Sequence, residues 1–368
     1  MKSFEHWDQD ISPKMLGYAI VSMTIAVGIL TLPRIITQNT QVFDGIISLM
    51  AGGVIALFFT YISAKLASRF RKQTFYVFTE KIASKYIAIV LTVVFALFFM
   101  LVTAFEVRML ANIAAKYLFD ETPEEVISLT FFLVVIYAVS GKHVAILRLN
   151  LMFLPIFFAV LFSLLILNIQ YLDLNHFTPF FTSSWRELLR GTFYAAANMI
   201  GLSIILFYVS FMRTPKKAPK AALIGALITI CVNMIIFFFV VGQLGPVVTR
   251  NVLYPTIEMA KETKVPGEFF ARFYAVFFTA WIMAIFNTTT MSLHVSTLAI
   301  DSLFKKMQKF RTILILAPII FYVSMLPIDI IQIGLITEWL MGIGALMGMG
   351  VPALLYVAAI LRKVKGNA

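Results

Sequence analysis

Long apolar runs separated by short polar segments dominate the chain. A helix that spans a bilayer needs about 20 consecutive, mostly apolar residues, and runs such as 86–101 contain almost no polar residue. The strands of a membrane barrel would instead alternate apolar and polar residues over segments of about ten. The pattern therefore predicts ten membrane-spanning helices, at 14–36, 44–67, 84–116, 125–140, 145–169, 187–212, 219–244, 267–300, 312–328 and 335–361.

Composition and charge agree with an integral membrane protein. Apolar residues make up 61% of the 368 residues and charged residues 13%, against roughly 45–50% and 25% in soluble domains. The 30 Lys and Arg residues exceed the 18 Asp and Glu residues, which gives a net charge of +12. The basic residues lie in short clusters between apolar runs, without the interleaved aromatic residues of a nucleic-acid surface. We therefore expect contact with a lipid bilayer and no binding of nucleic acid.

The distribution of Lys and Arg predicts the orientation. One alternating set of connections, which includes both termini, holds 21 of these residues, and the other set holds 8. By the positive-inside rule both termini are then cytoplasmic. The chain begins with the polar segment 1–14, and the first apolar run lacks the cleavage pattern of a signal peptide. We expect the first span to remain in the mature protein.

Ten helices with both ends on one side divide naturally into two halves of five. The odd number inverts the second half relative to the first, an arrangement typical of secondary transporters. The sequence predicts one transmembrane domain over 1–368, with a first five-helix repeat at 12–170 and a second, inverted repeat at 186–362.

Transporters of this kind interrupt one helix in each repeat, because unwound backbone facing a cavity can bind a ligand. The first predicted helix carries Gly28 in mid-span and Pro33 five residues later, and the sixth carries Asn198 and Gly201 at a matching depth. Gly and Pro are also common in ordinary membrane helices. We predict that both helices are broken at these positions.

The third predicted helix carries an acid and a base in an otherwise apolar run. Glu106 and Arg108 each cost about 2.5–3.5 kcal/mol at the centre of a bilayer. They lie about 200° apart around the helix and cannot pair with each other; Glu106 shares its face with Thr103, and Arg108 shares its face with Asn112. One hypothesis places Glu106 in a central cavity as a ligand contact, a proton acceptor or an anchor for water. The other gives both residues only structural partners on neighbouring helices, the role we favour for Arg108.

The eighth predicted helix is rich in hydroxyl and amide groups, which either join helices or line a cavity. We expect its His294 to be a hydrogen-bonded helix contact. The other histidines, His6, His143 and His176, are too scattered for a metal site. The chain has no Gly-x-Ser-x-Gly turn, no His-Glu-x-x-His pair and no acidic metal cluster. We therefore expect no enzymatic activity, no catalytic residues, no metal and no cofactor.

The motifs Ile11–Lys14 and Val27–Arg34 resemble the signature of the endospore germination permeases. These are the GerAB-type B subunits of nutrient germinant receptors, within the amino acid-polyamine-organocation (APC) superfamily. The similarity continues through 105–108, 122–127, 137–141 and 207–217, and so covers most of the chain. It implies an all-α integral membrane fold of ten transmembrane helices, a LeuT/APC-like 5+5 inverted repeat with broken helices 1 and 6.

The resemblance also implies a function. Members of this family are thought to bind a small nutrient, usually an amino acid, between the first, third, sixth and eighth helices. They work with receptor A and C subunits in the spore inner membrane and trigger germination. The positions that the resemblance makes ligand contacts in this chain are Gly28, Ile29, Thr31, Glu106, Gly201, Ser203 and Thr288.

The chain departs from the family pattern at three positions. An acidic residue often follows the Gly-aromatic pair of the sixth helix, where this chain has Leu202 and Ser203; Ser210 replaces a common Pro, and Thr24 a common Gln. These changes leave the identity of the ligand open. Two alternatives to a receptor subunit also remain: an amino acid transporter driven by cation symport, and a scaffold with a vestigial pocket.

Overall fold

The computed structural model describes residues 11–119, 121–263, 273–304, 308–327, 330–364 and 366. Apart from one isolated bridge between Ile11 and Met212, the regular elements in these ranges are helices. The main ones are α2 (Pro13–Ile25), α3 (Gly28–Asn39), α4 (Asp44–Arg69), α5 (Phe75–Ile82), α6 (Lys85–Tyr117), α7 (Glu124–Ser140), α8 (His143–Asn168), α9 (Trp185–Ala197), α10 (Ile205–Tyr208), α11 (Ala218–Asn251), α12 (Pro255–Glu262), α13 (Phe273–Leu303), α14 (Lys309–Met325), α15 (Ile330–Ala345) and α16 (Val351–Leu361).

Seven helical segments of the described chain are long and apolar enough to cross a bilayer, and the bent pair α2 and α3 supplies an eighth. The helices α7 and α14 are shorter, at 17 residues each. Every apolar run of the sequence overlaps one or two helices, although residues 267–272 of the eighth run lie outside the described residues. The protein is an all-helical, multi-pass membrane protein, as predicted.

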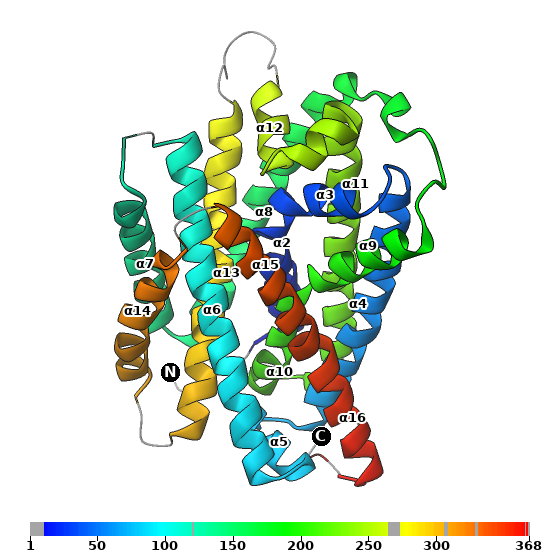
Figure 1. Cartoon of the computed structure of the whole chain (residues 1–368). Helices are drawn as coiled ribbons and strands as arrows, with labels where there is room; N and C mark the ends of the chain where they lie inside the picture. The colour runs from blue at the N-terminus through cyan, green and yellow to red at the C-terminus, as the bar shows by residue number, and fades with distance from the viewer. Residues whose placement is uncertain are drawn as a thin grey trace.

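Helix α2 occupies the middle of the bundle (Figure 1), and residues 19–26 are all buried. It begins where the sequence predicts, because the Ser12 side chain accepts a hydrogen bond from the Met15 amide (3.2 Å) and Pro13 follows the cap. The long helices α6 and α13 pack together beside it, and α7 with α14 flank them on one side. The helices α4, α9 and α11 form the other side, and α15 and α16 run obliquely across the front of the bundle (Figure 1).

Both predicted helix breaks are confirmed. Helices α2 and α3 meet at an angle of 52° across Ala26 and Val27. The sixth segment leaves α-helical geometry after Ala197 and continues as the 3₁₀ turn η3 (Ile200–Ile204) before α10 begins. A 3₁₀ turn pairs residues three apart, so the regular i to i+4 pattern of α9 is interrupted at this point.

The structure also contains elements that the apolar pattern did not reveal. The short helices α5 and α12 lie in segments that we interpreted as connections, since eight residues are too few for a membrane-spanning run. Helix α11 is bent at Gly245, which has a φ of +74° and precedes Pro246. The predicted seventh span ended at 244, just before this bend.

Candidate ligand pocket between the broken helices

A cavity of about 110 Å³ lies between the two helix breaks. Two further helices complete its wall: α6, through side chains that repeat every three to four residues along one face, and α15. The described residues that line it are Met23, Thr24, Val27, Gly28, Thr31, Phe98, Phe99, Val102, Phe105, Glu106, Asn198, Gly201, Thr337, Leu340 and Met341. Most of this wall is apolar, so the few polar groups decide what the cavity can hold.

Glu106 is the one ionisable side chain among the described residues of this wall. It is 6% exposed, and its Oε2 atom has no hydrogen-bond partner. The hydroxyl groups of Thr288 and Thr289 on α13 lie beside the carboxyl group, but each donates to the Ile285 carbonyl, at 2.9 and 2.7 Å. The protein therefore holds the acid in place and leaves one buried acceptor oxygen unpaired, which is rare without a functional reason.

Glycines allow the two breaks to approach each other. A Cβ atom at Gly28 would lie 2.7 Å from the amide group of Asn198, and one at Gly201 would lie 2.7 Å from the backbone oxygen of Met23. Asn198 caps the end of α9, and its Nδ2 atom has no hydrogen-bond acceptor. The cavity thus has a free amide donor from the sixth segment and a free carboxylate oxygen from the third.

Two backbone carbonyl groups near the first break have partners on other helices: that of Ala26 at the break, and that of Ile29, whose helical partner would be Pro33, which has no N–H. The Trp281 indole of α13 donates to the Ala26 oxygen (2.9 Å), and the Thr256 hydroxyl of α12 donates to the Ile29 oxygen (2.7 Å). We expected Ile29 to offer free backbone to a ligand, and the structure contradicts this expectation for its carbonyl group. The outer helix α12 is instead attached to the broken segment.

Replacing Thr256 with Val is expected to lower the free energy of unfolding by about 1–2 kcal/mol, because it leaves the buried Ile29 carbonyl without a donor. The measurement is thermal unfolding of the detergent-purified protein. Thr279→Val is the matched control, since Thr279 bonds only to Ala275 of its own helix and is exposed. Equal effects of the two changes would show that the attachment of α12 adds no stability.

The structure brings four of the seven expected contacts to the cavity wall: Gly28, Thr31, Glu106 and Gly201. Thr288 is not among the lining residues and takes part in the site only through its contact with Glu106. Ile29 and Ser203 are buried outside the lining.

Sequence reasoning missed Asn198 as a contact, although it lies in the predicted break, and it missed α15 altogether. The single hydroxyl of Thr337 within an apolar run was the available signal for this helix.

A second cavity, of about 220 Å³, continues the first one along α3 and α15 toward the segment that precedes α12. The two share Thr31, Thr337 and Met341 in their walls. The second cavity is more polar, with Arg34 and Glu338 among its lining residues. The two adjoining cavities therefore place Arg34 and Glu338 next to the central site.

On the side of the site away from the second cavity, contacts join the residue before α2 to the turn η4 (Val209–Phe211), and join α10 to α13 and α8. The Ile11 amide donates to the Phe211 oxygen (2.9 Å). The side chains of Tyr208, His294 and His143 form a hydrogen-bonded chain, with Tyr208 Oη to His294 Nδ1 at 3.0 Å and His294 Nε2 to His143 Nδ1 at 2.6 Å. The prediction that His294 is a helix contact is confirmed, and its partner His143, which we grouped with the scattered histidines, is the first residue of α8.

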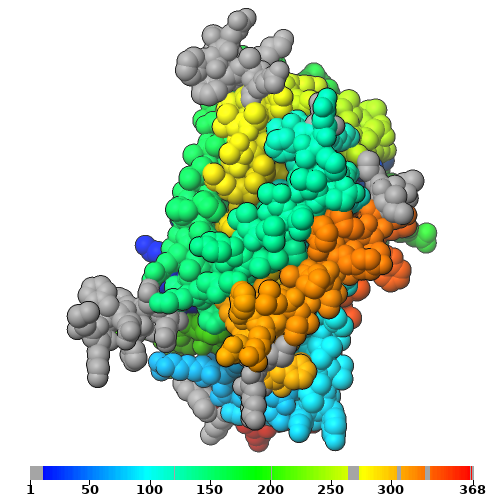
Figure 2. All heavy atoms as spheres, turned by 90° about the vertical axis from the view of Figure 1, so that its left-hand side faces the viewer, coloured from blue at the N-terminus to red at the C-terminus, as the bar shows by residue number. Residues whose placement is uncertain are grey.

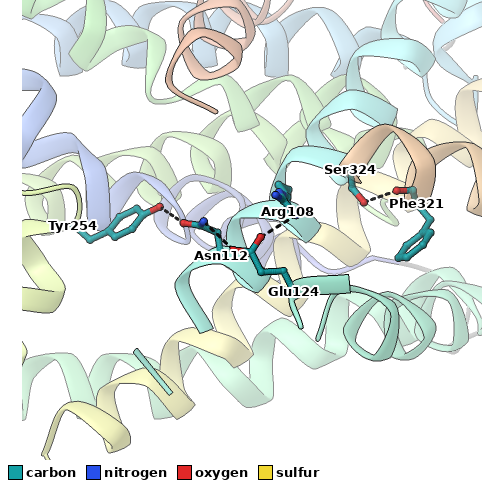
Figure 3. Close-up of polar contacts among 6 residues, drawn as sticks. All are labelled: Arg108, Asn112, Glu124, Tyr254, Phe321 and Ser324. Atoms are coloured by element: carbon teal, nitrogen blue, oxygen red, sulfur yellow. Dashed lines mark hydrogen bonds and ion pairs between the residues drawn. The ribbon is translucent and has the colours of Figure 1, made fainter. Parts of the chain in front are cut away.

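Arg108 has a structural partner, as we favoured. Its Nη1 atom lies 2.9 Å from Glu124 Oε2 on α7. Asn112, on the same face of α6, donates to Glu124 Oε1 (3.3 Å) and accepts from the Tyr254 hydroxyl (3.3 Å), as Figure 3 shows. In α14, Ser324 bonds back to Phe321 of its own helix (2.7 Å).

Replacing Arg108 with Met is expected to destabilise the protein by about 2 kcal/mol. Loss of one partner of a fully buried pair costs roughly 3–5 kcal/mol, and we lower that value because the Glu124 side chain is 28% exposed. In a double-mutant cycle with Glu124→Gln, measured by thermal unfolding, the double variant is expected to lose less than the sum of the single variants. Additive losses would mean that the ion pair does not couple the two helices.

Among the described residues, no group of three or more His, Cys, Asp or Glu side chains is placed to hold a metal ion. The polar groups of the cavity are a carboxyl group, an amide and helix ends. This chemistry suits the binding of a small polar molecule.

The chain is similar to known spore germination proteins. Residues 10–333 match the family model described as spore germination protein. The chain is 36% identical to the spore germination protein GerLB of Bacillus cereus, over 89% of this chain and 88% of the relative. It is 30% identical to YndE of Bacillus subtilis strain 168, over 94% of each chain, and 24% identical to spore germination protein A2 of that strain, over 95% of each.

Two solved structures share the fold. MhsT in complex with L-phenylalanine superposes with a TM-score of 0.69 at 16% identity, over 96% of this chain and 89% of that chain. Mhp1, a nucleobase-cation-symport-1 family transporter with bromovinylhydantoin bound, superposes with a TM-score of 0.65 at 14% identity, over 93% and 78%. The fold is thus APC-like, and the chain belongs to the spore germination protein family as a GerAB-type germination permease.

Proposed function

We propose that this chain is the membrane subunit of a spore nutrient germinant receptor and binds a small nutrient, an amino acid, in the central cavity. The observation that carries the proposal is the unpaired Oε2 atom of buried Glu106, in a cavity between two broken helices. A ligand with a positive charge would supply the missing partner and remove the penalty of a buried, unpaired acceptor.

An amino acid fits the remaining polar groups. Its ammonium group would pair with Glu106, and its carboxylate would accept from the Asn198 amide and from the first amides of α3, where the helix dipole favours negative charge. The phenylalanine-rich stripe of α6 and the side chains of Leu340 and Met341 would surround an apolar side chain. Thr31 and Gly201 complete the proposed contacts, and Thr288 supports them through Glu106.

The wider setting belongs to the same proposal. We infer ten transmembrane helices as two inverted repeats of five, at 12–170 and 186–362, in the spore inner membrane with both termini in the cytoplasm. Receptor A and C subunits would be the partners that convert ligand binding into germination. A ligand that binds one conformer better shifts the population toward it, and the bent α2–α3 pair is the element that such a shift would move.

The alternative function is a secondary transporter of amino acids by cation symport. The fold shared with MhsT and Mhp1 favours it, and we infer that a ligand would reach the site through the second cavity, which adjoins it.

Two experiments separate these functions. Uptake of a labelled amino acid mixture by the purified protein in liposomes supports transport. Binding of an amino acid, measured by isothermal titration without uptake, supports sensing, and a germination response that needs the partner subunits confirms it. Absence of both binding and uptake contradicts both functions.

A further inference from the structure

A chain of three hydrogen-bonded side chains connects three helices on the side of the pocket away from the second cavity. Tyr208 of α10, His294 of α13 and His143 of α8 are linked in that order, at 3.0 Å and 2.6 Å. Tyr208 and His294 are fully buried, whereas His143 is only half-buried. Among the described residues, no other hydrogen bond joins these three side chains to the protein. The chain therefore leads from the protein surface to a buried tyrosine.

This chain has one favourable direction when both histidines are neutral. A neutral imidazole donates from one nitrogen and accepts at the other. If Tyr208 donates to His294 Nδ1, then His294 Nε2 donates to His143 Nδ1, and every buried donor has an acceptor. In the opposite direction the Tyr208 hydroxyl accepts, and its own hydrogen is buried without an acceptor. The neutral protein therefore adopts the first direction.

A proton on His143 removes the favourable direction. A protonated imidazole carries a hydrogen on both nitrogens, so His143 Nδ1 must donate and His294 Nε2 must accept. His294 then donates from Nδ1 to Tyr208, and the buried tyrosine hydroxyl loses its acceptor. Histidine is the side chain that ordinarily changes charge between pH 5 and 8, so this reversal falls in an accessible pH range.

The charged groups near His143 add positive rather than negative charge. Lys309, at the start of α14, acts electrostatically on His143; Figure 2 shows α14 (orange) beside α7 (teal). Lys142 precedes His143 directly and has an interaction partner. The nearby carboxylate is Asp301 of α13, which interacts with Lys309 and accepts from the Thr312 hydroxyl. A proton on His143 therefore gains no carboxylate as its own partner.

The same side chains connect segments that adjoin both broken helices. The His143 ring stacks on Phe211 of η4, with centroids 5.3 Å apart, and the Phe211 carbonyl accepts from the amide of Ile11, just before α2. The Ile11 carbonyl accepts in turn from the Arg213 amide (3.4 Å). Tyr208 ends α10, the helix that follows the second break. The start of the first broken helix and the end of the second are thus connected to α8 and α13.

We propose that Tyr208, His294 and His143 form a pH-sensitive latch that closes this side of the pocket. The latch is closed when both histidines are neutral. Protonation of His143 reverses the hydrogen bonds, leaves the Tyr208 hydroxyl unpaired and opens this side. The latch responds to pH whether or not the pocket binds a nutrient.

Cysteine accessibility tests the latch. Ser292 lies half a turn before the latch histidine of α13; it is fully buried, and its hydroxyl contacts Met23 Sδ (3.9 Å). A Ser292→Cys thiol, in a Cys231→Ser background, is alkylated by a water-soluble reagent only when the protein opens. Dividing its rate by that of Thr74→Cys, at an exposed position, corrects for the effect of pH on thiol reactivity. We expect this ratio to rise about 10-fold from about pH 8 to about pH 5.5. An unchanged ratio would overturn the proposal.

Three variants separate the latch from a general effect of acid. His143→Asn keeps an acceptor for His294 but has no titratable ring, so its ratio should stay low at both pH values. Tyr208→Phe removes the link to α10, so its ratio should be high even in alkaline solution. His176→Asn changes a histidine of η2 (Leu174–Phe177), outside the latch, and should respond like the parent protein. A His143→Asn variant that responds to acid like the parent, or a Tyr208→Phe variant that stays closed, would reject the latch.

Discussion

Replacing Glu106 with Gln is expected to abolish nutrient binding and leave the protein folded. Gln has nearly the same shape as Glu, but its amide cannot neutralise an ammonium group. Removing one partner of a buried charge pair costs about 2–5 kcal/mol. The dissociation constant of the nutrient therefore rises by about 30-fold or more. Isothermal titration with a mixture of amino acids, followed by the single amino acid that binds, gives the measurement.

The unliganded Glu106→Gln variant should be as stable as the parent protein or more stable. The Oε2 atom of Glu106 has no protein partner, so the substitution leaves no protein donor without its acceptor, and a neutral amide costs less to bury than an ionised carboxyl group. Glu125→Gln makes the same chemical change at an exposed site on α7 and should leave binding unchanged. A Glu106→Gln variant that binds the nutrient with the affinity of the parent would exclude the carboxylate as a ligand contact.

The architecture could be predicted largely from the sequence, because lipid imposes a simple rule on it. Backbone groups in hydrocarbon must be paired within a helix, so apolar runs correspond directly to helices. The break next to Gly28 could also be predicted, because a glycine in mid-span weakens a helix. The short helices α5 and α12 were not visible, because they lie outside these runs.

The pocket could be predicted only in part, because contacts across space do not follow from helix periodicity. Glu106 could be identified because a charged side chain in an apolar run is costly to insert into a bilayer. The helical periodicity of α6 then showed that Glu106 and Arg108 lie on different faces. Periodicity could not show that Thr256 of α12 donates to the Ile29 carbonyl, 227 positions away. Nor could it show that α15 supplies a wall of the pocket, since its lining residues are mostly apolar.

The largest stability loss is expected from adding a single methyl group at Gly201. The Cβ atom of an Ala at this position would lie 2.5 Å from Met23 Cγ and 2.7 Å from the Met23 backbone oxygen. The side chain can rotate away, but the backbone oxygen belongs to the last turn of α2 and can move only with that helix. Overpacking of this kind costs about 1–3 kcal/mol, and we expect the upper end of this range in thermal unfolding.

Two other glycines give this prediction its controls. Gly342 has open space around it within α15, so Gly342→Ala should stabilise the protein by about 1 kcal/mol through helix propensity. At Gly28 the obstacle is the Asn198 side chain, which can rotate, so Gly28→Ala should cost less stability than Gly201→Ala but should weaken ligand binding by displacing the free amide. If the three variants unfolded at the same temperature, close contact between the two broken helices would not be what holds the pocket together.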